Sequence, residues 1–363
     1  MMMPFTGSYS LADVQFLLQP MAFADTPIAV KEAFIQSGQK HYSELLSHES
    51  LPSAAYLHLF HQGLARNQQR MAEHLLILAA KIVATRPNGI TLVSLARAGT
   101  PIGVLLKHIL QRYFQKETCH YSISILRDVG IDQNALRYIL QNHSPESLVF
   151  VDGWTGKGVI AEQLRQSLQA FAESDGIAIR PELYVLTDLS GSAAVAASHE
   201  DYLIPSCILN ATVSGLVSRS IFNRQLAEQG HFHGCVFYEQ FTAHDLSKYF
   251  IDTLLNAVAD LAFSQHRFSE IELNSIQLQA VSKQFLTRLA ERYGVSQVNY
   301  IKPGIGEASR VLLRREARLL LLQNLNDEAT QHLRWLAEAK QIPIERLSES
   351  PYRAVALIKE ISA

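Results

Sequence analysis

The chain has 363 residues, a formal net charge of −2, 48% hydrophobic residues and 18% charged residues. At roughly 150 residues per domain, this length predicts two or three domains. The apolar share excludes a disordered chain and is sufficient for a sizeable core. The small net charge excludes a protein that binds nucleic acid with its whole surface, although a local basic patch is compatible with it.

The cysteines and the N-terminal residues bear on the compartment. Cys119, Cys207 and Cys235 are widely spaced and odd in number, so they predict no disulfide framework and indicate a reducing compartment. The N-terminal residues lack the basic and apolar segments of a signal peptide. No stretch approaches the ~20 apolar residues of a membrane span. We therefore expect a cytoplasmic protein without membrane contact.

The first part of the chain predicts an α/β domain over residues 1–268. Residues 11–84 have helical periodicity and few glycines, which predicts a helical hood over 1–86. Strands alternating with helical patterns then predict a mainly parallel sheet within 87–268. The expected strands begin at Ile90, Tyr121, Ser147, Leu183 and Tyr202.

A second α/β alternation fills residues 274–363 and predicts a small α/β/α sandwich with its own core. Its expected strands lie in 297–301, 318–323 and 344–348, and a last helix is expected over 351–361. The boundary between the two domains is expected within 264–273.

The segment "SLVFVDGWTGKGVIAEQL", residues 147–164, places an acid and a glycine-rich turn between a strand and a helix. Such a turn presents backbone N–H groups to an anion at a helix N-terminus. Lys157 adds a charge, and Asp152 can accept hydrogen bonds from hydroxyl groups. The pattern fails the Walker A motif, while "GKGVIA" matches a dinucleotide fingerprint that is displaced from the strand end. Two interpretations remain: the loop binds a phosphorylated sugar, or it is a capped turn without a ligand.

The loop resembles the sugar-phosphate loop of type I phosphoribosyltransferases, and "VSLARAGTPIGVLLKHIL", residues 93–110, looks like the pyrophosphate loop of the same family. The resemblance implies a phosphoribosyltransferase-type sheet, phosphoribosyl diphosphate as substrate and Mg²⁺ as cofactor. It implies catalytic roles for Arg97 and Asp152. It implies substrate contacts from Ala98, Gly99, Thr100, Gly153, Thr155, Gly156, Lys157 and Gly158. This sequence has one acid where that family usually has two adjacent acids.

Further polar residues follow the other expected strands. In this family a mobile flap often follows the second strand, and Arg127 and Asp128 either close over the substrate there or form a surface ion pair. Asp188, Ser214 and Arg219 lie in polar turns that either face an acceptor or cap the turns.

The segment "GHFHGCVFYEQ" places His231, His233 and Cys235 at spacings of two. On an extended strand these side chains share one face. They are compatible with a metal site that needs a fourth ligand, with a thiol nucleophile at Cys235, or with a structural role.

The C-terminal part resembles the Pelota-type RNA-binding domain, which is related to ribosomal kink-turn binders. The resemblance rests on a glycine-rich turn that opens a helix, with glycine at 306 where asparagine is usual. It implies RNA contacts from Gly304, Gly306, Glu307, Arg310 and Arg314. A solvated basic helix face is the alternative.

The two parts together resemble a bacterial family in which a phosphoribosyltransferase-fold domain is fused to a Pelota-like domain. The family is associated with tellurite-resistance and stress gene clusters, and some relatives are labelled cysteine protease StiP. We expect a Mg²⁺-dependent phosphoribosyltransferase coupled to RNA binding. The alternatives are a non-catalytic nucleotide-sensing RNA binder and a cysteine hydrolase that uses Cys235. The sequence leaves open whether the chain forms a homodimer.

Overall fold

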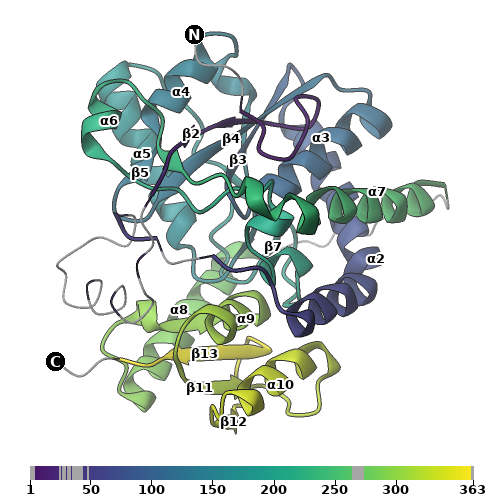
Figure 1. Cartoon of the computed structure of the whole chain (residues 1–363), viewed down its shortest axis with the longest axis vertical. Helices are drawn as coiled ribbons and strands as arrows, with labels where there is room; N and C mark the ends of the chain where they lie inside the picture. The colour runs from purple at the N-terminus through teal and green to yellow at the C-terminus, as the bar shows by residue number, and fades with distance from the viewer. Residues whose placement is uncertain are drawn as a thin grey trace.

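The computed structural model describes residues 5–23, 26, 30, 34, 44–46, 49–263 and 274–360. Figure 1 shows a larger N-terminal module above a smaller C-terminal one. The main sheet has the strand order β1-β4-β3-β6-β7-β8, and all of these neighbours are parallel. The strands are β1 (Gln15–Leu17), β3 (Ile90–Ala96), β4 (Thr118–Leu126), β6 (Leu148–Thr155), β7 (Leu183–Asp188) and β8 (Val195–Ser198).

Three short strands lie outside this order. They are β2 (Gln19–Pro20), which pairs with β9 (Gly234–Cys235), and β5 (Gly130–Ile131), which pairs antiparallel with β4. A short helix, α6 (Arg224–Glu228), precedes β9.

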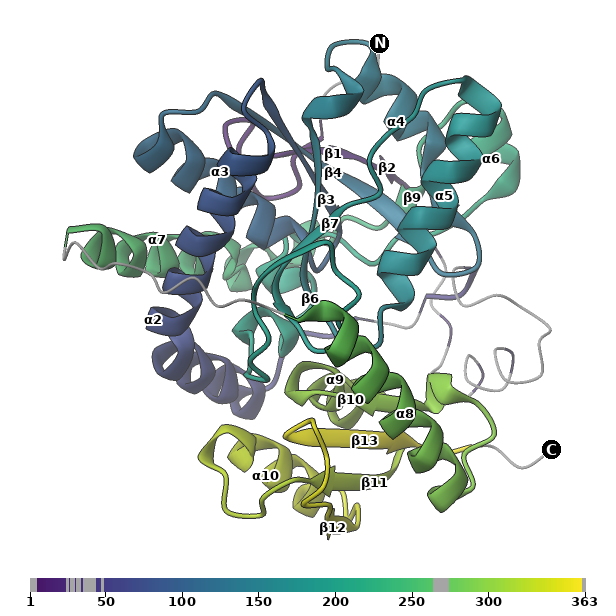
Figure 2. The same cartoon turned by 180° about the vertical axis from the view of Figure 1, so that it is seen from behind.

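Helices cover both faces of the main sheet, as Figures 1 and 2 show. One apolar cluster joins one face to α2 (Ala54–Thr85), α3 (Thr100–Phe114) and α7 (Ser247–Phe263). A second cluster joins the other face to α4 (Gln133–Leu140) and α5 (Val159–Asp175). Because both faces are covered, the central strands are almost continuously apolar, as in "LVFV" of β6. The prediction of a mainly parallel α/β sheet is confirmed.

The C-terminal module is a four-stranded sheet between helices. Its strand order is β10-β13-β11-β12. The apolar face of α8 (Ser275–Tyr293) packs on one side, and those of α9 (Ile305–Arg314) and α10 (Gln331–Ala339) pack on the other. The strands are β10 (Ile301–Pro303), β11 (Ala317–Leu322), β12 (Ile344–Arg346) and β13 (Ala354–Ile358).

The two modules share packing and hydrogen bonds. The cluster that lies under α2 and α3 continues into α9 and α10. Buried Asp201 accepts hydrogen bonds from the backbone N–H groups of Ile305, at 2.8 Å, and Arg353, at 2.9 Å. The docking therefore places the turn before α9 against the first module. The predicted boundary at 264–273 lies outside the described residues.

Four sequence predictions are wrong in detail. Residues 15–17 form an edge strand that pairs with β4, so the N-terminal hood is not wholly helical. The run from Tyr202 forms turns and the short 3₁₀ helix η3 (Pro205–Cys207), and the strand that follows β7 is the less apolar β8. Residues 354–358 form the buried strand β13, because a short apolar run has no periodicity that separates a strand from a helix. In 297–301 only Ile301 belongs to a strand.

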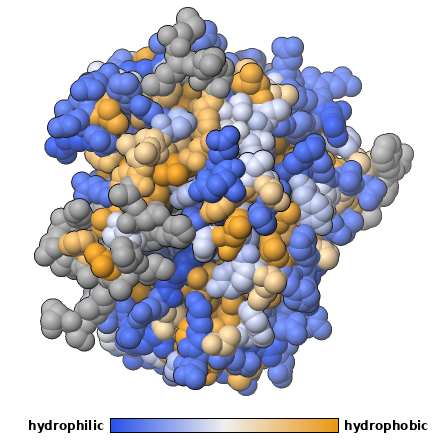
Figure 3. Space-filling model, in the orientation of Figure 1, coloured by the Kyte–Doolittle hydropathy of each residue, from blue (hydrophilic) through white to orange (hydrophobic). Residues whose placement is uncertain are grey.

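The surface agrees with a globular fold. Figure 3 shows hydrophilic and apolar residues mixed over the face that Figure 1 presents. Within the described part of the chain, every helix is too short or too polar to span a bilayer.

Candidate functional site at the junction of the two modules

A cleft of about 700 Å³ lies where the C-terminal module meets the carboxyl ends of β3 and β6. The first module contributes residues that follow both strands, and the second contributes residues from β10 and α9. This edge of a parallel sheet is where ligands bind in open α/β folds. The volume falls in the range of small-molecule pockets. The cleft is therefore the candidate site.

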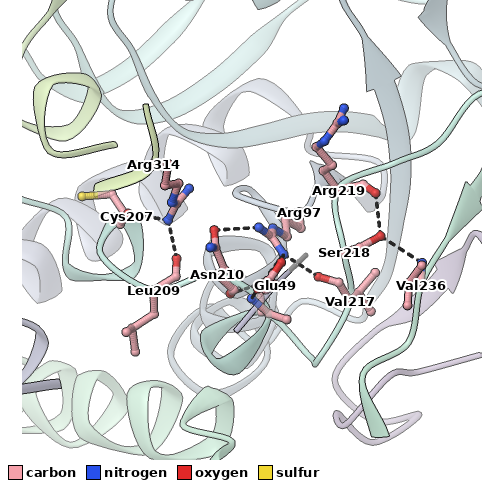
Figure 4. A network of polar contacts seen from close by, with 12 residues as sticks. Glu49, Arg97, Cys207, Leu209, Asn210, Val217, Ser218, Arg219, Val236 and Arg314 are labelled. Carbon is pink, nitrogen blue, oxygen red and sulfur yellow. Dashed lines mark hydrogen bonds and ion pairs between the residues drawn. The ribbon is translucent and has the colours of Figure 1, made fainter. Parts of the chain in front are cut away.

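Arg97 is held at the cleft wall by three partners from distant segments. Its guanidinium donates to the Glu49 carboxylate at 3.0 Å, to Asn210 Oδ1 at 2.7 Å and to the Val217 carbonyl at 2.9 Å. Figure 4 shows these side chains converging beside Arg314. Arg97 therefore connects the end of β3 to the 210–217 loop, and its guanidinium N–H groups already donate to protein acceptors.

The rest of the predicted pyrophosphate loop points away from the cleft, apart from Ala98, which lines it. A Cβ at Gly99 would come within 2.4 Å of the Val151 carbonyl, so glycine there permits close packing of β3 and β6. Thr100 is fully buried, and its hydroxyl lies 2.7 Å from that of Ser122. Gly99 and Thr100 therefore serve the helix–strand packing.

The predicted loop at 152–158 is partly strand, since β6 continues to Thr155. Asp152 lines the cleft, and its carboxylate accepts from the Gly153 N–H at 2.7 Å. The Thr155 hydroxyl donates to Asp188 inside the protein. Gly156 and Lys157 reach the other module.

The contacts of these two residues cross the junction. A Cβ at Gly156 would lie 3.2 Å from the Pro303 carbonyl, and Lys157 Nζ donates to the Val298 carbonyl at 2.8 Å. Gly158 has φ +80° at the start of α5, and a Cβ there would collide with Ser192.

The other predicted polar residues divide between the cleft and the interior. Asp188 is buried and accepts from Thr155, Ser190 and the Ala193 N–H, so it holds a turn. Ser214 is buried and donates to the Asn210 carbonyl. Arg127 and Arg219 line the cleft. Arg127 also forms an ion pair with its neighbour Asp128 at 2.9 Å.

The predicted RNA-binding turn also faces the junction. A Cβ at Gly304 would collide with Leu189 of the first module, and one at Gly306 would lie 3.1 Å from the Trp154 ring. Three more predicted residues of α9 line the cleft. Arg310 lies over the Trp154 ring at 4.5 Å and pairs with Glu307 at 3.4 Å. Arg314 donates to the carbonyls of Cys207 and Leu209, both at 2.9 Å.

Burial and charge shift the ionisation of the cleft residues. Burial raises the pKa of Asp152 to about 6, and Arg310 opposes that shift. Burial and then Lys302 lower the pKa of Lys157 to about 7. Burial acts to raise the pKa of Glu307, but the surrounding cations outweigh it and lower this pKa.

The cysteines and histidines of the described residues form no metal cluster of three or more ligands. His233 is buried; its ring Nδ1 lies 2.8 Å from the Ser124 hydroxyl, and its backbone N–H donates to Asp132. Cys235 is buried, and burial raises the pKa of its thiol to about 12. The backbone carbonyl of His231 accepts from the Asn134 side chain. His233 and Cys235 therefore lie in the interior, while His231 is half-buried and precedes the strand.

Sequence reasoning missed several residues of the site. Ser309 and His332 were not singled out: the Ser309 hydroxyl lies 2.8 Å from His332 Nε2 and beside Cys207, which is buried in the core as the sequence predicted. These three residues come from η3, α9 and α10. Trp154 and Lys302 also line the cleft. No local pattern relates residues that meet only when the modules dock, although Trp154 stood inside the loop already singled out.

The chain matches two family descriptions. Residues 7–255 match "Tellurite-like stress resistance cysteine protease StiP", and residues 280–360 match "PELOTA RNA binding domain". The chain belongs to the StiP family, and its C-terminal part is similar to the Pelota RNA-binding domain. A relative from Acinetobacter baylyi (strain ATCC 33305 / BD413 / ADP1), "Cysteine protease StiP", is 40% identical over 367 residues, which cover 98% of this chain and 95% of the relative.

A solved structure, a hypoxanthine-guanine phosphoribosyltransferase from Bacillus anthracis, is 13% identical and covers 38% of this chain and 82% of its own. Its TM-score of 0.27 is too low to support a shared fold or function.

The expectation of a phosphoribosyltransferase is wrong. The family and the relative are both described as cysteine proteases, which conflicts with that reaction and with the substrate and magnesium that it would use. The tellurite-stress and Pelota links of the sequence analysis are confirmed.

Proposed function

We propose that this chain is a thiol peptidase with an RNA-recognition module, and that Cys207 is its nucleophile. The family description and the name of the Acinetobacter relative support the activity. Cys207 lies beside Ser309, whose hydroxyl is 2.8 Å from His332 Nε2, and this arrangement supports the assignment.

A thiol peptidase uses the thiolate to attack the peptide carbonyl. A carbon–sulfur bond forms, the C–N bond breaks as the amine takes up a proton, and water then hydrolyses the thioester. In the docked arrangement burial raises the pKa of Cys207 to about 11, although Arg310 and Arg314 oppose this. The thiol is therefore protonated at neutral pH. The docked arrangement is a resting state, and turnover requires that water and substrate reach η3.

The test is hydrolysis of a fluorescent casein substrate by the full chain, with and without iodoacetamide. We expect Cys207→Ala to abolish the activity that iodoacetamide abolishes, and Ser309→Ala to reduce it. Cys235→Ala and Cys119→Ala are the matched controls and should retain it, with folding of each variant checked by circular dichroism. If only Cys235→Ala loses the activity, the nucleophile is Cys235 and not Cys207. Absence of alkylation-sensitive cleavage would refute the peptidase proposal.

We further propose that the C-terminal module binds RNA through the α9 end that faces the cleft. Arg310 and Arg314 are suited to phosphate contacts, and RNA proteins commonly recognise non-helical nucleotides. Fluorescence anisotropy with a labelled RNA should show weaker binding in Arg310→Ala than in Arg292→Ala, a control on α8. Equal binding by both variants would place the RNA surface elsewhere.

We also infer that the first module has the architecture of type I phosphoribosyltransferases without their reaction. The strand ends at 97–100 and 152–158 support this, since Arg97 and Asp152 line one cleft. The division into 1–268 and 274–363 is part of the same proposal. The three free cysteines support a cytoplasmic location.

A further inference from the structure

The cleft between the modules carries an excess of positive charge. Eight of its lining side chains are Lys or Arg, and three are Asp or Glu. Glu49 pairs with Arg97, one oxygen of Glu307 pairs with Arg310, and one oxygen of Asp152 accepts from a backbone N–H, so the acids offset only part of this charge. The lining therefore attracts an anion.

The cations of the cleft are partly desolvated and repel one another. Burial lowers the pKa of Lys302, and Arg315 and Arg127 lower it further. Burial, and then Arg310, lower the pKa of Arg314 to about 9. Cations held together in this way are stabilised by an anion placed between them. Both modules supply them, so the anion site exists only in the docked chain.

The part of the cleft next to these cations can hold an organic group. The Arg310 guanidinium lies over the ring of Trp154, and its plane lines the cleft as a surface on which a base can stack. Asp152 and Glu307 offer carboxylate oxygens to hydroxyl or amino donors. Arg310 Nε is buried and has no hydrogen-bond partner among the described residues. A ligand that combines a phosphate, an aromatic ring, and hydroxyl or amino donors matches these groups.

We propose that the cleft binds a nucleoside phosphate, with the phosphate between Lys157 and Lys302 and with donor groups of the nucleoside at Asp152 and Glu307. Lys157 Nζ uses one donor on the Val298 carbonyl and keeps two for a ligand. The ligand spans the junction and so favours the docked arrangement. This inference does not rest on Cys207 being a nucleophile, and its failure would leave the peptidase proposal standing.

The phosphate has two sources, a free mononucleotide or the phosphorylated end of an RNA strand. Isothermal titration of the full chain with AMP, GMP, CMP and UMP tests the first. Titration with a short single-stranded RNA, with and without a 5′-phosphate, tests the second. Adenosine and inorganic phosphate test the two halves of the ligand separately.

We expect at least one nucleotide source to bind, and binding to weaken at least tenfold in Lys302→Met and in Lys157→Met. Lys248→Met, an exposed position on α7, is the matched control and should bind as the original chain does. Asp152→Asn should weaken the nucleotide but not inorganic phosphate. Because a variant could lose docking, each one is also checked for an unchanged unfolding midpoint without ligand.

Three results would overturn the proposal. One is no detectable heat or thermal shift with every nucleotide and RNA at millimolar concentration. Another is equal affinity for inorganic phosphate and nucleotide, which would leave only a simple anion site. The third is equal weakening by Lys248→Met and Lys302→Met, which would indicate non-specific attraction.

Discussion

Gly306 lies so close to Trp154 that a Cβ at position 306 would stand 3.1 Å from the indole ring. The related RNA-binding turns usually have asparagine at this place, and here the first module occupies the space of that side chain. Arg310, one helical turn further on, lies over the same ring. Glycine at position 306 therefore permits this close approach of the two modules.

Replacing Gly306 by asparagine should weaken this docking. The ring must shift to admit the side chain, and overpacking of this kind costs about 1–3 kcal/mol. We expect a lower free energy of unfolding in urea, and a partial recovery when Trp154→Ala is added. The control is Gly176→Asn, since a Cβ at position 176 meets nothing within 4 Å and asparagine tolerates positive φ. An equal loss in both single variants would argue against the contact.

The Arg97–Glu49 pair should contribute measurably to stability. The two side chains are 16% and 10% exposed, and Arg97 also serves Asn210 and Val217. Arg97→Met should lower the free energy of unfolding by about 2–3 kcal/mol, because hydrogen bonds to charged groups are lost and polar partners stay buried.

The matched control for this variant is Arg127→Met, which breaks an exposed pair and should cost less than about 1 kcal/mol. A double-mutant cycle with Glu49→Gln measures the coupling. A coupling energy near zero would mean that the pair contributes little.

Asp152 should make stability depend on pH. Burial raises the pKa of its carboxyl to about 6, against about 3.9 in the unfolded chain. Between these values the native state holds a proton that the unfolded chain has lost. The contribution of this carboxyl group to the free energy of unfolding is therefore complete below about pH 4 and is lost as the pH rises to about 6.

Urea unfolding measured from pH 4 to pH 7 tests this dependence. The free energy of unfolding of Asp152→Asn should fall less between pH 4 and pH 7 than that of the original chain, by a difference of at most about 3 kcal/mol. The remaining decline should come in part from Asp201, whose pKa burial also raises to about 6. Asp175→Asn is the control, because its ion pair with Arg137 lowers the pKa of Asp175 and gives a dependence of opposite sign. An unchanged profile in Asp152→Asn would show that this carboxyl titrates normally.

The thiols should differ sharply in reactivity. Cys119 is exposed, and Cys207 and Cys235 are buried. Titration with a chromogenic disulfide should label one thiol rapidly in the native chain and all three in denaturant. Cys119→Ser should remove the rapid phase. Rapid labelling of Cys207 in the native chain would show that η3 opens without a ligand and that the docked state is not a resting state.

The sequence predicted the elements with the strongest patterns. Strands β3, β4, β6 and β7 were placed because their apolar runs are long and are bounded by turns, and Arg97 and Asp152 line one cleft as expected. Thr100 was expected to contact a ligand, yet its hydroxyl lies against Ser122 in the core. Thr155 lines the cleft, but its hydroxyl donates to Asp188, which holds a turn. Their polarity serves packed turns, and sequence cannot distinguish an inward hydroxyl from an outward one.

The missed part of the site depends on docking. Ser309 and His332 are ordinary polar residues of two helices, and only tertiary packing brings them to Cys207. Gly306, which the sequence predicts to contact RNA, packs against Trp154 of the same chain. Residues that act across a domain junction have no sequence spacing by which to recognise them.

Binding of a nucleotide in the cleft should be accompanied by proton uptake. The pKa of Lys157 is about 7 in the free chain, so at pH 8 most of this side chain is neutral. A phosphate beside it favours the ammonium form and raises its pKa. The chain should therefore take up as much as about one proton per bound nucleotide at pH 8 and much less at pH 6.

The uptake is measured by isothermal titration calorimetry: a mononucleotide shown to bind is titrated into a solution of the chain, once in Tris and once in HEPES. The heats of ionisation of these two buffers differ. The observed enthalpy should differ between the buffers at pH 8 and nearly coincide at pH 6. In Lys157→Met the difference at pH 8 should disappear, while Lys248→Met should retain it. Equal enthalpies in both buffers for the unchanged chain, with binding intact, would remove Lys157 from the phosphate site.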